Sequence, residues 1–306
     1  LAGHEDRVRR AIAAHLATAG IASRGDRLGN LIATLPGAVD APSVMVFAHM
    51  DQLGFVVRKV EADGRLRLTR LGGVPERALA AQAVRVATRT GELSGVIANK
   101  SHHATEPEEK YTVLRTADLS VDCGFASAAE AARAGVAIGD PVTYLPRLVP
   151  LAGNRIAATA LDDRAGCAVL VLLAEALQAD PARPTVHVVF SVQEEFNLRG
   201  AVVAAQALKP DIAIQIDLML ATDTPDMADR GEMRLGGGPG MSLYSFHGRG
   251  TLNGVIPHPA LVDLFERTAG SAGIALQRSA QTGILTDNSY VQLVGRDRGM
   301  VIVRLN

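Results

Sequence analysis

Acidic and imidazole side chains follow four apolar stretches of the sequence, at the points where those stretches end. His49 and Asp51 close the run VFAHMD. The others are Asp162 and Asp163 in ALDDRAG, Glu194 and Glu195 in FSVQEE, and Asp217 in IAIQID. Because ligands bind outside the carboxyl ends of strands in open α/β sheets, we expect these groups to meet at one rim. Carboxylates gathered there would repel unless a cation neutralised them, and with neutral imidazole they suit zinc, cobalt or manganese.

Taken one at a time, these residues have plainer interpretations. A histidine after a strand is more often structural, an aspartate before a helix is more often an N-cap, and a Glu-Glu pair in a loop is usually solvated. The joint pattern, with six carboxylates and a histidine gathered at strand ends, is what favours a metal site.

The spacing within two of these motifs suggests a division of roles. His49 and Asp51 are two residues apart, so on a strand they face the same side, and Asp51 can orient the imidazole through the nitrogen that does not bind metal. Glu194 and Glu195 are adjacent and must point different ways. One can bind metal while the other acts as a general base on a water, which is what a metal-dependent hydrolase needs.

The elements that must position these groups alternate between helical and strand patterns. Val8, Ile12 and Leu16 have helical spacing within 4–19, and 43–48 is rich in strand formers. After Asn154 we expect helices near 164–178, 199–208 and 258–270, and strands at TVHVVFSV, DIAIQI and MVIVRL. This alternation predicts a doubly wound α/β domain.

A different pattern interrupts that domain. Short strand-like runs separated by Asp-Gly, Gly-Gly and Gly-Asp turns occupy 54–153, with little helix except AEAARAG. We therefore predict a discontinuous catalytic domain, 1–53 and 154–306, and an inserted β domain, 54–153.

Composition excludes several classes of partner. The 306 residues carry 31 Lys plus Arg against 32 Asp plus Glu, and a net charge of −1 gives no reason to expect nucleic acid or an anionic membrane. Two cysteines make no disulfide framework. No segment approaches the ~20 apolar residues of a membrane span, and the charged start LAGHEDRVRR is unlike a signal peptide. We expect a cytoplasmic protein.

The motifs together carry a family resemblance. HMDQLGFVV, LGGV, ALDDRAGCAV, VFSVQEEFNLRGA, DIAIQIDLMLATDTP, GGGPGMSL and TDN, in this order, resemble the tetrahedral aminopeptidases, which include proteins labelled glutamyl aminopeptidases or endoglucanases. SHHATEPEEKY, DLSVDCGFAS and GVAIGDPV extend the likeness through the insert. The resemblance implies a mixed-sheet, zinc-peptidase-like catalytic domain interrupted by a β-rich dimerisation domain. It also implies self-association, as a dimer or as a hollow tetrahedral dodecamer with inward-facing active sites.

Two divalent metal ions per subunit, zinc or cobalt, are implied by the same resemblance. It makes His49, Asp162 and Asp217 the ligands of one ion. Asp162 bridges to a second ion, which Glu195 also holds. A cis peptide bond after the bridging aspartate, between Asp162 and Asp163, is a further expectation from the family.

The resemblance also assigns the catalytic groups. Glu194 becomes the general base and Asp51 the orienting partner of His49. We expect an aminopeptidase in which a metal-bridged hydroxide attacks the carbonyl carbon that follows the N-terminal residue of a peptide. Which N-terminal residue it prefers is not readable from the motifs.

The chain departs from the family pattern at two places. The family's last metal ligand is a histidine beyond the final strand, whereas this sequence stops at Asn306, so the second site is incomplete and we expect a C-terminal tail that carries the histidine. The family's Gly-Gly-Thr-Asp is altered to GILTDN, which leaves Asp287 without an assigned role. We interpret the remaining candidates as surface or packing residues: His102, His103, His187, His247 and His258.

Three alternatives stay open. A catalytically impaired scaffold or assembly member of the same family would bind one metal, which metal stoichiometry would reveal. A glycosidase would use two carboxylates without metal, so chelation separates it from a metallopeptidase. A small-amide hydrolase on the same scaffold would differ only in its substrates.

Overall fold

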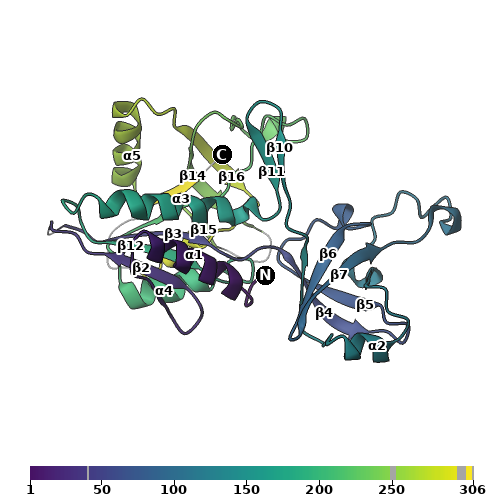
Figure 1. Ribbon diagram of the computed structural model, residues 1–306. Coiled ribbons are helices and arrows are strands. Elements are labelled where there is room, and N and C mark those ends of the chain that lie inside the picture. Colours follow the sequence, from purple (N-terminus) through teal and green to yellow (C-terminus); the bar gives the residue numbers. More distant parts are fainter. Residues whose placement is uncertain (40, 249–252, 295–300, 305–306) are drawn as a thin grey trace. The chain divides into compact units, whose positions relative to one another are not determined.

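The computed structural model describes residues 1–39, 41–248, 253–294 and 301–304, and the chain divides into two compact units (Figure 1). One unit comprises Leu1–His4 and Gln52–Ala160, and the other comprises Glu5–Asp51 and Leu161–Asn306. The boundary predicted after residue 153 falls between two strands that pair with each other, β10 and β11, and a paired hairpin belongs in one unit. The unit therefore extends to Ala160.

The unit that carries Asp217 is built on a mixed sheet with the order β1-β2-β12-β3-β13-β17-β14-β15, and β16 pairs with β14. Strands β12, β3, β13 and β17 are parallel, whereas β2 and β14 run antiparallel to their neighbours in this set. The strands are β1 (Arg24–Gly25), β2 (Leu31–Leu35), β3 (Val44–His49), β12 (Val186–Ser191), β13 (Ile212–Gln215), β14 (Gly240–Phe246), β15 (Gly254–Val255), β16 (Gln277–Thr282) and β17 (Val301–Arg304).

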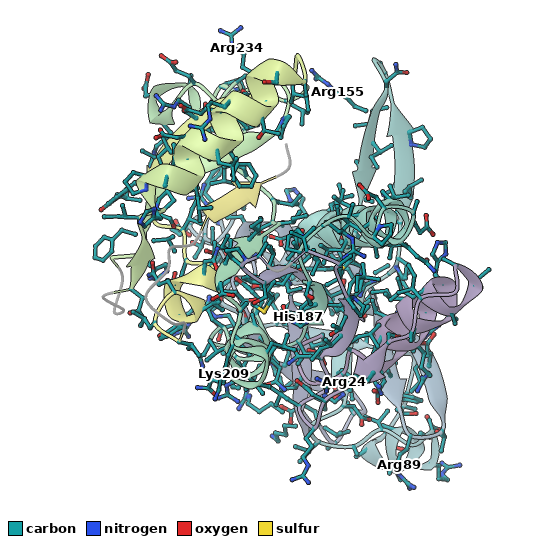
Figure 2. The ribbon with its side chains drawn as sticks, turned by 90° about the vertical axis from the view of Figure 1, so that its left-hand side faces the viewer. Arg24, Arg89, Arg155, His187, Lys209 and Arg234 are labelled. Carbon is teal, nitrogen blue, oxygen red and sulfur yellow. The ribbon has the colours of Figure 1, made fainter. Side chains whose placement is uncertain are left out.

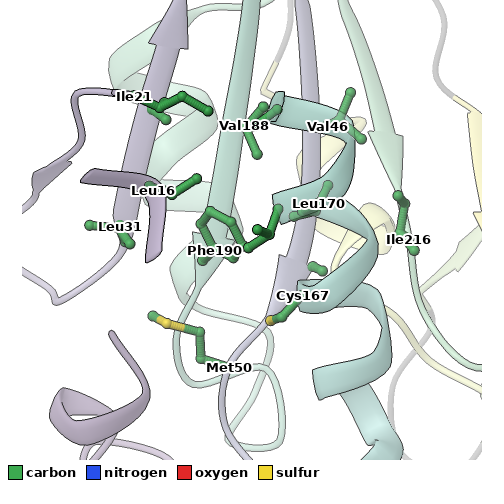
Figure 3. Packing of buried hydrophobic residues seen from close by; sticks show 14 of the residues in the cluster. Leu16, Ile21, Leu31, Val46, Met50, Cys167, Leu170, Val188, Phe190 and Ile216 are labelled. Atoms are coloured by element: carbon green, nitrogen blue, oxygen red, sulfur yellow. The ribbon is translucent and has the colours of Figure 1, made fainter. Parts of the chain in front are cut away.

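Helices cover both faces of this sheet. They are α1 (Asp6–Thr18), α3 (Leu161–Gln178), α4 (Gly200–Leu208), α5 (Pro259–Ser271) and α6 (Asn288–Val291). Strand β3 alternates between the faces: Val46 lies in the core cluster formed with α1 and α3, and Phe47 lies in the cluster formed with α4. Figure 3 shows Leu170 of α3 packed near Phe190 and Val46 in the first of these cores. The alternating pattern of the sequence thus produces the expected α/β layering.

The predicted helices and strands of this unit are confirmed, with ends shifted by a few residues, but five strands and helix α6 were missed. Residues 300 and 305, at the two ends of the last predicted strand MVIVRL, lie outside the described residues. The missed strands are β1, β2, β14, β15 and β16. Strand β16, which pairs with β14 off the main path of the sheet, has the sequence QRSAQT. This sequence has no alternation of apolar and polar residues, so sequence reasoning could not detect it.

The other unit is a closed six-stranded barrel with the order β4-β5-β8-β7-β6-β9. Its strands are β4 (Gly54–Val60), β5 (Leu66–Leu71), β6 (Ala83–Thr88), β7 (Gly91–Ala98), β8 (Ser120–Asp122) and β9 (Pro141–Tyr144), followed by the separate hairpin of β10 (Leu148–Leu151) and β11 (Arg155–Ala158). A helix, α2 (Ala128–Arg133), accompanies the barrel. Phe55, Leu66 and Val84 are fully buried members of its core. Among the described residues of the whole chain, no helix is long and apolar enough to cross a membrane.

Candidate metal centre

His49 lies at the end of β3, between the parallel strands β12 and β13, and its side chain is 2% exposed. Its Nε2 is 3.0 Å from Oδ1 of Asp162, and its Nδ1 is 3.4 Å from Oδ1 of Asp51. The two ring nitrogens therefore face different carboxylates.

Asp51 connects His49 to the loop that follows β12. The carboxylate is fully buried, and it accepts hydrogen bonds from the backbone N–H groups of Glu194 at 3.1 Å and Glu195 at 3.0 Å. Burial opposes ionisation, but the contact with His49 and these N–H donors outweigh it and lower the pKa of Asp51. Asp51 is thus fixed beside Nδ1 of His49 at 3.4 Å, although Nδ1 itself has no aligned hydrogen-bond partner.

Asp162 and Asp163 stand at the start of α3 and are joined by a cis peptide bond, which confirms that expectation. Asp162 has a side chain that is 54% exposed, whereas Asp163 is fully buried. Asp163 accepts hydrogen bonds from the backbone N–H groups of His49 at 3.3 Å and Gly166 at 3.1 Å. A Cβ atom on Gly166 would lie 2.5 Å from both Asp163 carboxylate oxygens, so this close approach requires glycine.

Asp217 follows β13 and faces the same group. Within the described part of the chain, His49, Asp163 and Asp217 each offer a ligand atom, and these atoms all lie within 4.8 Å of one another. The set differs from the sequence-based one, which named Asp162. Sequence reasoning noticed Asp163 but gave it no ligand role, and its position beside Asp162 was the signal that could have included it.

Each carboxylate oxygen of Asp217 is held by a donor. Its Oδ1 accepts the N–H of Leu218 at 2.7 Å, and its Oδ2 accepts a hydrogen bond from Nε2 of Gln215 at 2.9 Å. Gln215 is 1% exposed, and sequence reasoning did not single it out. An uncharged amide inside the apolar run IAIQI was the available signal.

Glu194 and Glu195 differ in exposure, as their adjacency implies. Glu194 is buried, and Glu195 is partly buried. Burial raises the pKa of Glu195 to about 7 and raises that of Glu194 well above its ordinary value. Negative charge on Asp287 and Asp217 adds to the effect on Glu194.

Asp287, which the sequence left unassigned, is part of this electrostatic group. Its carboxylate is fully buried, its Oδ2 accepts a hydrogen bond from Oγ of Ser191 at 3.2 Å, and its Oδ1 has no hydrogen-bond partner. Burial, with the charges of Asp51 and Asp217, raises its pKa to about 7.

The residues present fit a divalent cation. Burial alone would lower the pKa of His49, yet the surrounding carboxylates, Glu194 above all, raise it well above the ordinary value. Burial together with charge repulsion raises the pKa of Asp163. Imidazole and carboxylate donors suit zinc and cobalt. The 3.0 Å from His49 Nε2 to Asp162 Oδ1 is compatible with both atoms binding one ion at ligand distances of about 2.0–2.2 Å.

Several of the other histidines have structural settings. His187 lies on β12 (Figure 2), and its Nδ1 is 3.0 Å from Oγ1 of Thr34. His258 caps α5, where its Nδ1 accepts the N–H of Ala260 at 3.2 Å. His102 and His103 belong to the barrel unit. The histidine expected beyond Asn306 would follow the last residue of this sequence and stays a prediction.

The sequence from residue 29 to residue 304 matches the family model of the M42 glutamyl aminopeptidases. The chain belongs to this family. As an M42 aminopeptidase, it is a metal-dependent hydrolase that acts on peptide bonds. The resemblance recognised in the sequence motifs is thereby confirmed.

Relatives of this M42 aminopeptidase align over most of its length. The aminopeptidase-family protein SgcX of Escherichia coli strain K12 is 39% identical over 269 residues, which cover 88% of this chain and 72% of that protein. The lysyl aminopeptidase of Pyrococcus furiosus is 36% identical over 221 residues, which cover 71% of this chain and 62% of that protein.

Solved structures share the fold. A TET aminopeptidase from Thaumarchaeota archaeon SCGC AB-539-E09 superposes with a TM-score of 0.91 at 28% identity, covering 99% of this chain and 84% of that one. The TET1 peptidase of Pyrococcus horikoshii, which can assemble into a tetrahedron or a large octahedral shell, gives a TM-score of 0.87 at 28% identity over 100% of this chain and 86% of that one. The M42 chain therefore has the α/β fold of the TET aminopeptidases.

Proposed function

We propose that His49, Asp162 and Asp217 of this aminopeptidase hold one zinc or cobalt ion, and that Asp162 and Glu195 contribute to a second. The observation that carries the proposal is the buried imidazole of His49, whose Nε2 faces Asp162 at 3.0 Å inside a ring of carboxylates with raised pKa values.

Asp162 is a better ligand than Asp163 because of how their oxygens are used. Asp163 already accepts two backbone N–H groups, and one of them belongs to His49. Asp162 faces Nε2 of His49 and has a side chain that is 54% exposed. Asp163 then positions the end of β3, and Asp162 binds the ions.

The bound ions supply polarisation of the scissile carbonyl and a lower pKa for the attacking water. Glu194 lies next to the ligand Glu195 in the loop that Asp51 holds by two hydrogen bonds. Its buried carboxylate accepts the proton of that water and returns it to the leaving amine. Asp51 orients His49 and fixes the position of Glu194, so one residue organises both the ligand and the base.

The substrates we propose are peptides with a free N-terminal amine. The family model is named for glutamyl aminopeptidases, and one relative is a lysyl aminopeptidase. Peptides with acidic and with basic N-terminal residues therefore both belong in the substrate panel. Peptides with a blocked N-terminus are the control, because a small-amide hydrolase would not distinguish them.

We also propose that the barrel unit pairs subunits into a dimer, from which a tetrahedral dodecamer is built. Support comes from the TET1 peptidase of Pyrococcus horikoshii, which can assemble into a tetrahedron or a large octahedral shell and whose fold matches 100% of this chain. The barrel contributes none of the proposed ligands, since all of them lie in the other unit.

Metal removal tests the function. Dialysis against a chelator should abolish hydrolysis of aminoacyl anilides, and added zinc or cobalt should restore it, whereas blocked peptides stay intact throughout. Activity that survives complete metal removal would contradict the proposal and favour metal-independent chemistry. Metal binding without any activity on the panel would favour an impaired assembly member instead.

A further inference from the structure

Gln215 is a buried amide in an apolar setting. It ends β13, and it shares a strand face with Ala213, which lies in the core cluster formed with α4. The side chain is 1% exposed. An amide buried there is costly unless both of its polar atoms are hydrogen-bonded, so its partners indicate why it is present.

Its two hydrogen bonds define one orientation of the amide. The backbone N–H of Asn288 can only donate, so the atom 2.9 Å from it is Oε1 of Gln215. The NH₂ group is then the one that faces Oδ2 of Asp217, at 2.9 Å. The amide is therefore a fixed bridge between a carboxylate of the metal centre and the first residue of α6.

This bridge restricts the Asp217 carboxylate. With Oδ2 held by Gln215 and Oδ1 held by the N–H of Leu218, rotation about the Cβ–Cγ bond would break both hydrogen bonds. A ligand atom of Asp217 lies within 4.8 Å of those of His49 and Asp163. The neighbour of Asn288 in sequence is Asp287, which the Ser191 hydroxyl ties to the end of β12.

We propose that Gln215 is a positioning residue of the metal centre, which fixes the Asp217 carboxylate for metal binding and ties it to the start of α6. The inference rests on the proposed function in one respect, the assignment of Asp217 as a metal ligand. Loss of a partner that orients a ligand typically costs 10–100-fold in metal affinity, and we expect a loss of about that size for Gln215.

The test measures cobalt affinity by competition with a chelator, and the visible absorption spectrum of the bound cobalt. Gln215→Met keeps the volume of the side chain and removes both hydrogen bonds. Gln215→Glu keeps an acceptor for Asn288 and removes the donor to Asp217. We expect Gln215→Met to lower cobalt affinity at least ten-fold, and both variants to shift the cobalt spectrum.

Gln277 offers a matched control, because it is also a two-sided amide bridge. Its Oε1 accepts the N–H of Arg234 at 2.8 Å, and its Nε2 donates to the carbonyl oxygen of Gly238 at 2.8 Å, so its partners are loop backbone only. Gln277→Met should lower the melting temperature and leave cobalt affinity and spectrum unchanged.

Asp217→Asn distinguishes an error in the proposed ligand set from an error in the role of Gln215. If this variant keeps full cobalt affinity, the proposed ligand set is wrong. If it loses affinity while Gln215→Met and Gln215→Glu retain the wild-type affinity and spectrum, the role of Gln215 is overturned. Should Gln215→Met fail to fold by circular dichroism, Gln215→Glu decides: a wild-type cobalt spectrum in that variant refutes the inference.

Discussion

At the scale of single residues, the centre depends on an unequal use of neighbouring carboxylates. Glu194 and Glu195 donate their backbone N–H groups to the same Asp51, yet Glu194 is the more buried. Asp162 and Asp163 are adjacent as well, and only Asp163 is enclosed. In each pair, one side chain is buried and its neighbour is more exposed to solvent, so we assign the two residues different chemical roles.

Replacing the proposed base tests the first pair. Glu194→Gln should keep metal and fold but lower kcat at least ~100-fold, because general-base catalysis contributes about that much. Steady-state kinetics with metal content measured on the same sample checks it. Glu195→Gln is the comparison and should lose metal instead. Near-normal turnover of metal-loaded Glu194→Gln would show that another group takes the proton.

The second pair is tested by metal content after dialysis without chelator. Asp162→Asn should lose bound metal, because it removes a ligand charge beside Nε2 of His49. Asp163→Asn should retain metal with weakened affinity, since it disturbs only the anchor of the β3 end. Atomic emission on both variants gives the answer, and the opposite ranking would make Asp163 the ligand.

At the scale of elements, the start of α3 positions the carboxylates through one close contact. Gly166 lies one turn into the helix, and its N–H and its missing side chain both serve Asp163. The next residue, Cys167, donates its thiol to the carbonyl oxygen of His49 at 3.2 Å within the core shown in Figure 3. Helix α3 therefore carries Asp162 and Asp163 in its first turn and also contacts the end of the strand that carries His49.

A pair of glycine substitutions distinguishes this contact from ordinary helix propensity. Gly166→Ala should destabilise the protein by about 1–3 kcal/mol, because the new Cβ overlaps the Asp163 carboxylate. A Cβ atom added at Gly270 of α5 would meet no neighbouring atom within 4 Å, so Gly270→Ala should be stabilising by up to about 1 kcal/mol. Chemical denaturation measures both, and equal effects would mean that the Asp163 contact is unimportant.

At the scale of the whole molecule, the barrel unit has a closed sheet and its own hydrophobic core. That core is separate from the cores of the unit that carries the proposed metal ligands. Proposed chemistry and proposed assembly therefore belong to different units. This separation allows the assembly to be changed without removing any metal ligand.

Light scattering tests the assembly. The intact protein should be a dimer or larger at micromolar concentration, and deletion of the barrel unit should leave a monomer or an insoluble catalytic unit. Metal content of any soluble deletion variant provides the control for its fold. An intact protein that is monomeric at this concentration would contradict the pairing role.

The sequence by itself determined the alternation of helices and strands, the barrel-forming insert as a run of short strands, and the residue types at the strand ends. These follow from local periodicity, because a strand that ends in a polar residue carries that residue to the sheet rim wherever the strand lies. The order of the motifs along the chain was enough to identify the family.

Only the tertiary structure decided which of two adjacent aspartates is enclosed, that Asp287 joins the electrostatic group, and that Gln215 bridges Asp217 to α6. The Asp287 and Gln215 contacts join segments far apart in the chain, such as β13 with the start of α6. Their distances depend on how loops and helices pack against the sheet, and periodicity within one segment carries no information about the spacing between two. The enclosure of Asp163 likewise needs the end of β3 and the first turn of α3 at contact distance, which close packing sets and the residue order alone does not.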